Sequence, residues 1–185
     1  MQLNELLSNT AEMTGFYDSL KEKGRHMITG VSGSVRTLLL ADLEEKFQVP
    51  LIVVCDDLFH AQSLEEDLTN VFAEEDIDLF PVEENFAAAI SASSPEYKAQ
   101  RVRTLQKMAD GSSKIVVTSV SGIRRMLCPK DFWLKSTIKF KLGEEIIPEK
   151  LKQELCTMGY RAVKMVERPG DFAVRGSIFD IYALN

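Results

Sequence analysis

The sequence has few of the residues that build disulfide frameworks, metal centres or hydrolytic sites. Its 185 residues include three cysteines, Cys55, Cys128 and Cys156, and two histidines, His26 and His60. The cysteines stand too far apart for a CxxC or metal-ligand cluster, and neither histidine has catalytic partners in its sequence neighbourhood. We expect reduced cysteines packed as small core thiols, no metal site and no catalytic residue.

Long apolar segments and an excess of positive charge are also missing. No stretch approaches the ~18–20 apolar residues of a membrane span, and no basic segment precedes an apolar run at the N-terminus. We therefore expect a cytoplasmic protein without membrane contact. Lys and Arg number 22 against 28 Asp and Glu, a net charge of −6. An acidic chain is a poor candidate for autonomous binding to nucleic acid, because that affinity comes mainly from Lys and Arg.

The composition is that of a globular protein, with 45% hydrophobic and 27% charged residues. The charge is unevenly divided: residues 1–128 hold 12 basic and 20 acidic side chains (net −8), and residues 129–185 hold 10 and 8 (net +2). The change falls at Cys128-Pro129, where proline disfavours helix continuation. We predict two units, 1–128 and 129–185.

The first unit alternates strand and helix signals. Short apolar runs rich in β-branched residues predict buried strands, and apolar residues at helical spacing predict helices between them. We expect strands at 26–29, 51–55, 78–80 and 114–120, and helices at 37–47, 61–71, 95–109 and 121–127. This order is typical of an α/β fold in which helices cover both faces of a parallel sheet.

The second unit differs in pattern. Alternating residues predict a half-exposed strand at 138–142, and Pro148 begins a helix that Gly159 ends. Two strands, 160–166 and 172–182, are expected to flank a turn at 168–171, which indicates a small α+β unit with antiparallel character. Along one continuous strand, Ile178 would face the core together with Phe172 and Val174.

A glycine-rich segment, residues 30–37, resembles a phosphate-binding loop placed between a strand and a helix. The motif GxxxxGK[ST] needs glycine, lysine and a hydroxyl at its end to hold phosphates and magnesium. Here Gly30, Gly33 and Thr37 are present, but Val35 replaces the second glycine and Arg36 replaces the lysine. A β-branched residue obstructs close approach of a phosphate to the backbone. We expect a degenerate loop that serves as a scaffold without catalysis.

An acidic pair after the apolar run 51–55 has two interpretations. Asp56-Asp57 resembles the acid that positions magnesium in phosphate-loop enzymes, and it also suits the cap of the following helix. We favour the cap, because the pair follows the loop by only about one helix.

Several segments together resemble a known family. They are residues 30–37 and 51–57, SPEYKAQR at 94–101, residues 115–120 with IRRMLCP at 123–129, and PGDFAVRGSIFDIY at 169–182. They resemble the N-terminal region of the bacterial transcription-repair coupling factors, a region that is similar to the excinuclease B subunit, UvrB. The last segment is the most specific part of the resemblance.

The resemblance implies a fold and a function. The fold would be a RecA-like (P-loop NTPase-like) subdomain, 1a, followed by part of an inserted α+β subdomain, 2, with the chain ending inside it at Asn185. The function would be recruitment of the excinuclease A subunit, UvrA, in transcription-coupled nucleotide excision repair, and the module would also pack against other domains of the factor. ATP, magnesium, DNA and RNA polymerase would be bound by motor and polymerase-binding domains outside this chain, so no cofactor is expected here.

The same resemblance implies contact residues. Arg175, in the RG pair, matches an arginine that contacts UvrA, and Arg161 lies within one residue of a second basic position. Phe179 is either an exposed interface aromatic or part of a second packed layer, and Gly176 is expected to permit a bulge or close packing rather than to contact a partner.

Two other functions stay open. The chain could be an active phosphate-loop ATPase or half of a helicase that tolerates Arg36, which binding of ATP with magnesium would reveal. It could also be a DNA-binding module that recognises damage, with an affinity that falls steeply with salt.

Overall fold

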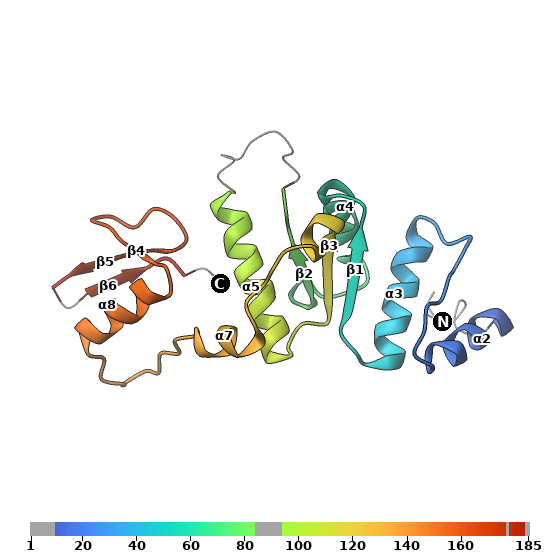
Figure 1. Ribbon diagram of the computed structural model, residues 1–185, viewed down its shortest axis with the longest axis horizontal. Helices are drawn as coiled ribbons and strands as arrows, with labels where there is room; N and C mark the ends of the chain where they lie inside the picture. The colour runs from blue at the N-terminus through green and yellow to red at the C-terminus, as the bar shows by residue number, and fades with distance from the viewer. Residues whose placement is uncertain (1–9, 84–93, 177, 184–185) are drawn as a thin grey trace.

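The computed structural model describes residues 10–83, 94–176 and 178–183, which form two three-stranded sheets with helices around them (Figure 1). The first sheet lies in the middle of the view, α2 and α3 lie at one end, and the second sheet lies with α8 at the other. In chain order the helices are α2 (Ala11–Leu20), α3 (Ser34–Phe47), α4 (Leu58–Leu68), α5 (Pro95–Asp110), α6 (Val120–Ile123), α7 (Lys130–Lys135) and α8 (Pro148–Thr157). The strands are β1 (Leu51–Cys55), β2 (Ile77–Phe80), β3 (Ile115–Ser119), β4 (Arg161–Ala162), β5 (Asp171–Arg175) and β6 (Ile178–Ile181), and a 3₁₀ turn at Glu74–Asp76 precedes β2.

The first sheet is parallel, with the strand order β1-β3-β2. Alternate residues of β3 point to opposite faces, so Ile115 and Val117 pack against α4, and Val116 packs toward α5. Helices therefore lie on both faces of the sheet, as predicted. The core on the α4 side contains Ala61, Leu64, Leu68, Ile77, Leu79, Ile115 and Val117. The core on the α5 side contains Phe80, Val82, Leu105 and Val116, with Trp133 of α7 packed against it.

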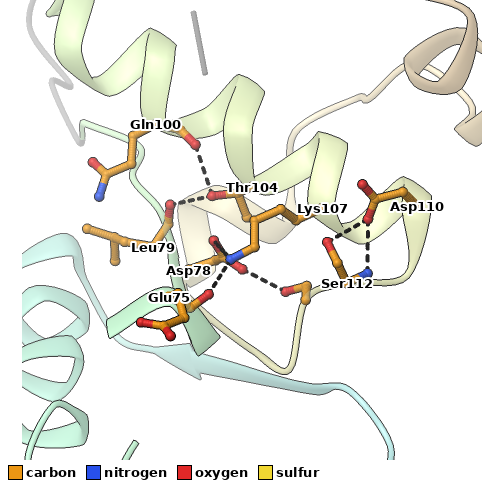
Figure 2. Close-up of polar contacts among 9 residues, drawn as sticks. Glu75, Asp78, Leu79, Gln100, Thr104, Lys107, Asp110 and Ser112 are labelled. Carbon is orange, nitrogen blue, oxygen red and sulfur yellow. Dashed lines mark hydrogen bonds and ion pairs between the residues drawn. The ribbon is translucent and has the colours of Figure 1, made fainter. Parts of the chain in front are cut away.

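A buried polar cluster joins β2 to α5 (Figure 2). The side chain of Asp78 is almost fully buried, and Lys107 Nζ donates to its Oδ1 at 2.8 Å while Ser113 Oγ donates to its Oδ2 at 2.9 Å. Thr104 Oγ1 lies 2.8 Å from the carbonyl oxygen of Leu79. These bonds satisfy a carboxylate that would otherwise be costly to bury, and they set how α5 lies on the sheet.

Two helices begin at residues whose side chains cap them, which confirms the cap interpretation of Asp57. Ser94 is the N-cap of α5, and its hydroxyl accepts from the backbone N–H groups of Glu96 and Tyr97. Asp57 is the N-cap of α4, where its carboxylate accepts from the backbone N–H of His60 at 2.8 Å. That bond, followed by the contact with the His60 ring, lowers the pKa of Asp57. Gly111 ends α5 in the left-handed conformation.

The strand expected at 26–29 does not form. These residues belong to no helix or strand, and Met27 is almost fully exposed. The segment instead joins α2 to α3, and the two helices are held together by Tyr17, whose buried hydroxyl donates to Asp42. Lys46 Nζ lies 3.8 Å from the centre of the Tyr17 ring. The four-residue apolar run finds no strand to pair with in the described part of the chain.

The prediction of core thiols is wrong for two cysteines. Cys55 is partly buried at the end of β1 and packs against the α4 side of the core, and this burial raises the pKa of its thiol. Cys128 and Cys156 are exposed. Cys156 lies on the opposite side of α8 from Leu151 and Leu155, which take the buried positions.

The second unit differs from the expectation in its strands. Residues 138–142 form no strand, and Ile138 packs against α8 and the second sheet from an irregular segment. The expected strand 172–182 is a hairpin of β5 and β6, which are antiparallel, and β4 pairs with β5 in parallel.

The described part of the chain contains no helix long and apolar enough to cross a membrane.

The proposed boundary at Cys128-Pro129 stays a prediction. The first element after it, α7, packs against α5 of the preceding unit, and Trp133 of α7 covers part of the core on that side of the sheet.

Candidate functional site

The β5–β6 hairpin decides which side chains of the second unit are available to a partner. In both parallel and antiparallel pairs, residues opposite one another point to the same face of a sheet. Val174 is opposite Phe179 and Phe172 is opposite Ile181, and these four residues pack with Leu151 and Leu155 of α8. The face turned away from α8, called the far face below, carries Arg161, Asp171, Ala173, Arg175, Ile178 and Asp180.

Both predicted contact arginines lie on the far face. Arg161 of β4 is opposite Asp171 of β5. Arg175 follows Asp171 by four residues along β5, which is about 13 Å at the usual rise of a strand. Both side chains are well exposed. The structure thus brings together two residues that are 14 positions apart in the sequence.

The alternation expected for residues 172–182 is wrong after Gly176. The chain turns there, with Gly176 at φ +60° in the left-handed region, so the face of each later residue is set by its partner on β5. Ile178, expected in the core, is opposite Arg175 and 59% exposed. Phe179, for which two positions were open, is half-buried against the core of the second unit.

Each arginine of the far face has an acidic neighbour. Arg175 donates to Asp180, which is partly exposed on β6. Arg161 Nη2 donates to Oδ1 of Asp171 at 2.7 Å, and Asp171 is buried. Burial alone would raise the pKa of Asp171, but the bond and charge of Arg161 and nearby backbone N–H groups outweigh it, so the pKa is lowered.

The glycine-rich loop has a different geometry from the one expected. Gly33, at φ +56°, is the N-cap of α3, so Val35, Arg36 and Thr37 belong to the first turn of that helix. Helix α3 thus begins three residues earlier than predicted, and no strand precedes the loop among residues 10–29. The Thr37 hydroxyl is buried and has no hydrogen-bond partner in the part of the chain that the structure describes.

A second candidate region escaped the sequence analysis. Side chains from α5, from the segment after α6 and from the residues before β5 line a cleft of about 750 Å³. Its cationic side chains are Lys98, Arg101, Arg125, Arg161 and Arg168. They come from four separate segments of the chain, so no sequence motif of fixed spacing identifies them. The only sequence signal was that Arg101 and Arg125 lie in segments already singled out for the family resemblance.

The C-terminal unit matches a known family model. The model described as "UvrB interaction domain" matches residues 138–185, a range that includes α8 and the three strands of the second sheet. The far face, with Arg161 and Arg175, therefore lies inside the matched range.

Curated proteins match nearly the whole chain. A transcription-repair-coupling factor of Bacillus subtilis is 35% identical over 172 residues, which cover 93% of this chain and 14% of that protein. Proteins of the same description from Staphylococcus haemolyticus and Staphylococcus aureus are 29% and 28% identical over 158 residues, or 85% of this chain. The chain spans about 14% of the length of these relatives.

Proposed function

Since this chain belongs to the family of the bacterial transcription-repair-coupling factors, we propose that it is a docking module that recruits the excinuclease A subunit, UvrA, in transcription-coupled nucleotide excision repair. The observation that carries the proposal is the placement of Arg161 and Arg175 together on the far face, within the range that matches the UvrB interaction domain. In the proposal both guanidinium groups contact carboxylates of UvrA, because a planar guanidinium fork pairs bidentately with carboxylates.

The far face has the character of a protein-docking surface. Arginine is enriched at protein interfaces and often dominates their energetics. Exposed Ile178 lies directly opposite Arg175 and supplies apolar area beside the charge. Phe179 contributes from the other face of β6 by holding the hairpin on α8. Its role as a direct contact remains a prediction.

We further propose that the first unit is a RecA-like scaffold without ATPase activity. Val35 occupies the position of the second motif glycine inside a helical turn, and the hydroxyl of Thr37 is buried where a magnesium ligand would have to be accessible. ATP-driven translocation on DNA and contact with RNA polymerase are assigned to other parts of the full-length factor, against which this module would pack.

Capture of purified UvrA by the immobilised chain tests the proposal. Arg175→Ala is expected to lower the affinity at least about tenfold, because loss of one partner of a desolvated charge pair is costly. Lys150→Ala is the matched control: it removes one exposed cation from α8 in the same unit, and Lys150 makes only a long ion pair of 3.7 Å with Glu154. Equal capture by the Arg175→Ala variant and the unmodified chain would refute the assignment of Arg175. Failure of both to capture UvrA would refute the proposed partner.

A further inference from the structure

The cleft between the two units gathers positive charge in an otherwise acidic chain. We call it the basic cleft, lined by Lys98, Arg101, Arg125, Arg161 and Arg168 together with apolar residues. No Asp or Glu is among its described lining residues. A chain with a net charge of −6 thus places five cations around a volume of about 750 Å³.

The described residues leave most of this charge without a neutralising partner. In the described part of the chain, the side chains of Lys98, Arg125 and Arg168 make no hydrogen bond or ion pair. Arg101 is the most buried of the five, and its Nη1 donates to the carbonyl oxygen of Pro81 at 2.8 Å. Burial, and to a smaller extent the nearby charge of Arg125, lower the pKa of Arg101.

The acidic groups that the structure describes near the cleft balance only part of the charge. Asp171 is paired with Arg161. Glu83 lies close enough to act on Arg101, and exposed Glu96 close enough to be affected by Arg168, but neither forms an ion pair with these arginines. The repulsion that remains among the cations of the cleft is relieved best by an anion that carries several negative charges in a small space.

The composition of the wall favours phosphate as that anion. Four of the five cations are arginines, whose forks match phosphate oxygens bidentately. A compact polyphosphate carries two or more charges within a few ångströms, whereas each carboxylate of a peptide carries one. A long nucleic acid is disfavoured, because residues 1–128, which form one wall, carry a net charge of −8.

From these observations we propose that the basic cleft binds a compact ligand that carries two or more linked phosphate groups, as in inorganic pyrophosphate or a nucleoside triphosphate. Arg125, Arg168 and Lys98 contact the phosphates. Trp133 and Phe80 line the apolar part of the cleft, where a nucleoside base would pack. The site is separate from the glycine-rich loop and goes beyond the docking function, although Arg161 borders both the cleft and the far face.

The single tryptophan of the chain makes the proposal directly measurable. Trp133 lines the cleft, and its Nε1 donates to the carbonyl oxygen of Cys128 at 3.2 Å. Pyrophosphate and ATP are titrated separately into the purified chain without divalent metal, with tryptophan fluorescence and calorimetry as readouts. We expect saturable binding and a dissociation constant raised at least about tenfold in the double variant Arg125→Ala, Arg168→Ala.

Two variants serve as matched controls. Arg124→Ala removes an exposed arginine next in sequence to Arg125 that does not line the cleft, and Arg36→Ala removes the cation of the glycine-rich loop. Both should bind pyrophosphate and ATP as the unmodified chain does. Similar affinities for pyrophosphate and ATP would indicate that the phosphates alone are recognised, and tighter binding of ATP would show that the base also contributes. Both results support the proposal.

The proposal is overturned by any of three results. They are no heat or fluorescence change with either ligand at millimolar concentration, an equal loss in Arg124→Ala, or a loss confined to Arg36→Ala. Circular dichroism establishes that the double variant is folded. The double variant should still capture UvrA, so failure of phosphate binding is distinguishable from failure of the docking function.

Discussion

Val174 of β5 lies directly opposite Phe179 of β6, so both side chains point toward α8 while Arg175 and Ile178 point away from it. At this end of the hairpin the pairing separates residues that hold the second unit together from residues that a partner can reach, whereas Asp171 and Ala173 of the far face are buried. The same separation defines the first prediction.

Phe179→Ala is expected to destabilise the second unit, because it removes a half-buried aromatic side chain from the core against α8. Ile178→Ala removes an exposed side chain from the neighbouring position and should leave stability nearly unchanged while weakening UvrA capture. Thermal unfolding followed by circular dichroism, together with UvrA capture, distinguishes them. If Phe179→Ala leaves the unfolding temperature unchanged and abolishes capture, Phe179 is a contact residue and its structural role is refuted.

The second prediction concerns the buried ion pair between β2 and α5. Asp78→Ala leaves Lys107 without its carboxylate in a largely buried place, and we expect a loss of ~3–5 kcal/mol in the free energy of unfolding. Asp76→Ala breaks the more exposed pair with Lys114 and should have a much smaller effect. Urea denaturation measures both. Similar losses in the two variants would contradict the structural role of the Asp78 cluster.

Two glycine substitutions form the third prediction. A Cβ atom at Gly122 would lie 2.0 Å from Oγ1 of Thr118, whose hydroxyl donates to the carbonyl oxygen of Phe80 at 2.9 Å. Gly122→Ala must displace that hydroxyl, so we expect destabilisation of ~1–3 kcal/mol. Gly15 lies in α2 with no atom within 4 Å of such a Cβ, and Gly15→Ala should stabilise by ~0.5–1 kcal/mol. Opposite signs in urea denaturation are the expected result, and equal signs would contradict the close approach at Gly122.

The fourth prediction follows from the lowered pKa of Asp171. Because that pKa is lower in the folded chain than in the unfolded chain, Asp171 contributes stability above its ordinary pKa of about 4, and the contribution is lost as pH falls through the lower folded value. Arg161→Ala removes the main group that lowers the pKa, so the variant should lose stability at pH 7 and lose less on acidification. Urea midpoints between pH 3 and pH 7 measure this. Lys150→Ala should show the profile of the unmodified chain, and an Arg161→Ala profile parallel to it would contradict the prediction.

The fourth prediction also bears on the interpretation of UvrA capture. Arg161 supports a buried carboxylate as well as lying on the far face. Loss of UvrA capture in Arg161→Ala therefore identifies a contact residue only when the variant unfolds at the same temperature as the unmodified chain. Arg175 pairs with the partly exposed Asp180 and supports no buried carboxylate, so Arg175→Ala tests contact with UvrA more directly.

The local sequence determined those helices and strands whose sequence pattern lies within one short segment of the chain. The β-branched run at Leu51–Cys55 formed a strand, and Ser94-Pro95 began a helix, because both depend on neighbours in the chain. The burial expected for that strand is wrong, because β1 lies at the edge of its sheet with Ile52 and Val54 exposed. The family resemblance, carried above all by residues 169–182, was also available from sequence and is supported by a relative that matches 93% of the chain.

Tertiary structure decided the rest, because pairing and burial depend on residues far apart in the chain. The apolar run at 26–29 had strand character but no strand to pair with among the described residues, so it stayed irregular. The turn at Gly176 moved Ile178 to the far face and Phe179 toward α8, since a residue after a hairpin takes its face from its partner. The basic cleft arises only when Arg101, Arg125 and Arg168 are folded together from three segments, and repulsion among charges acts through space rather than along the sequence.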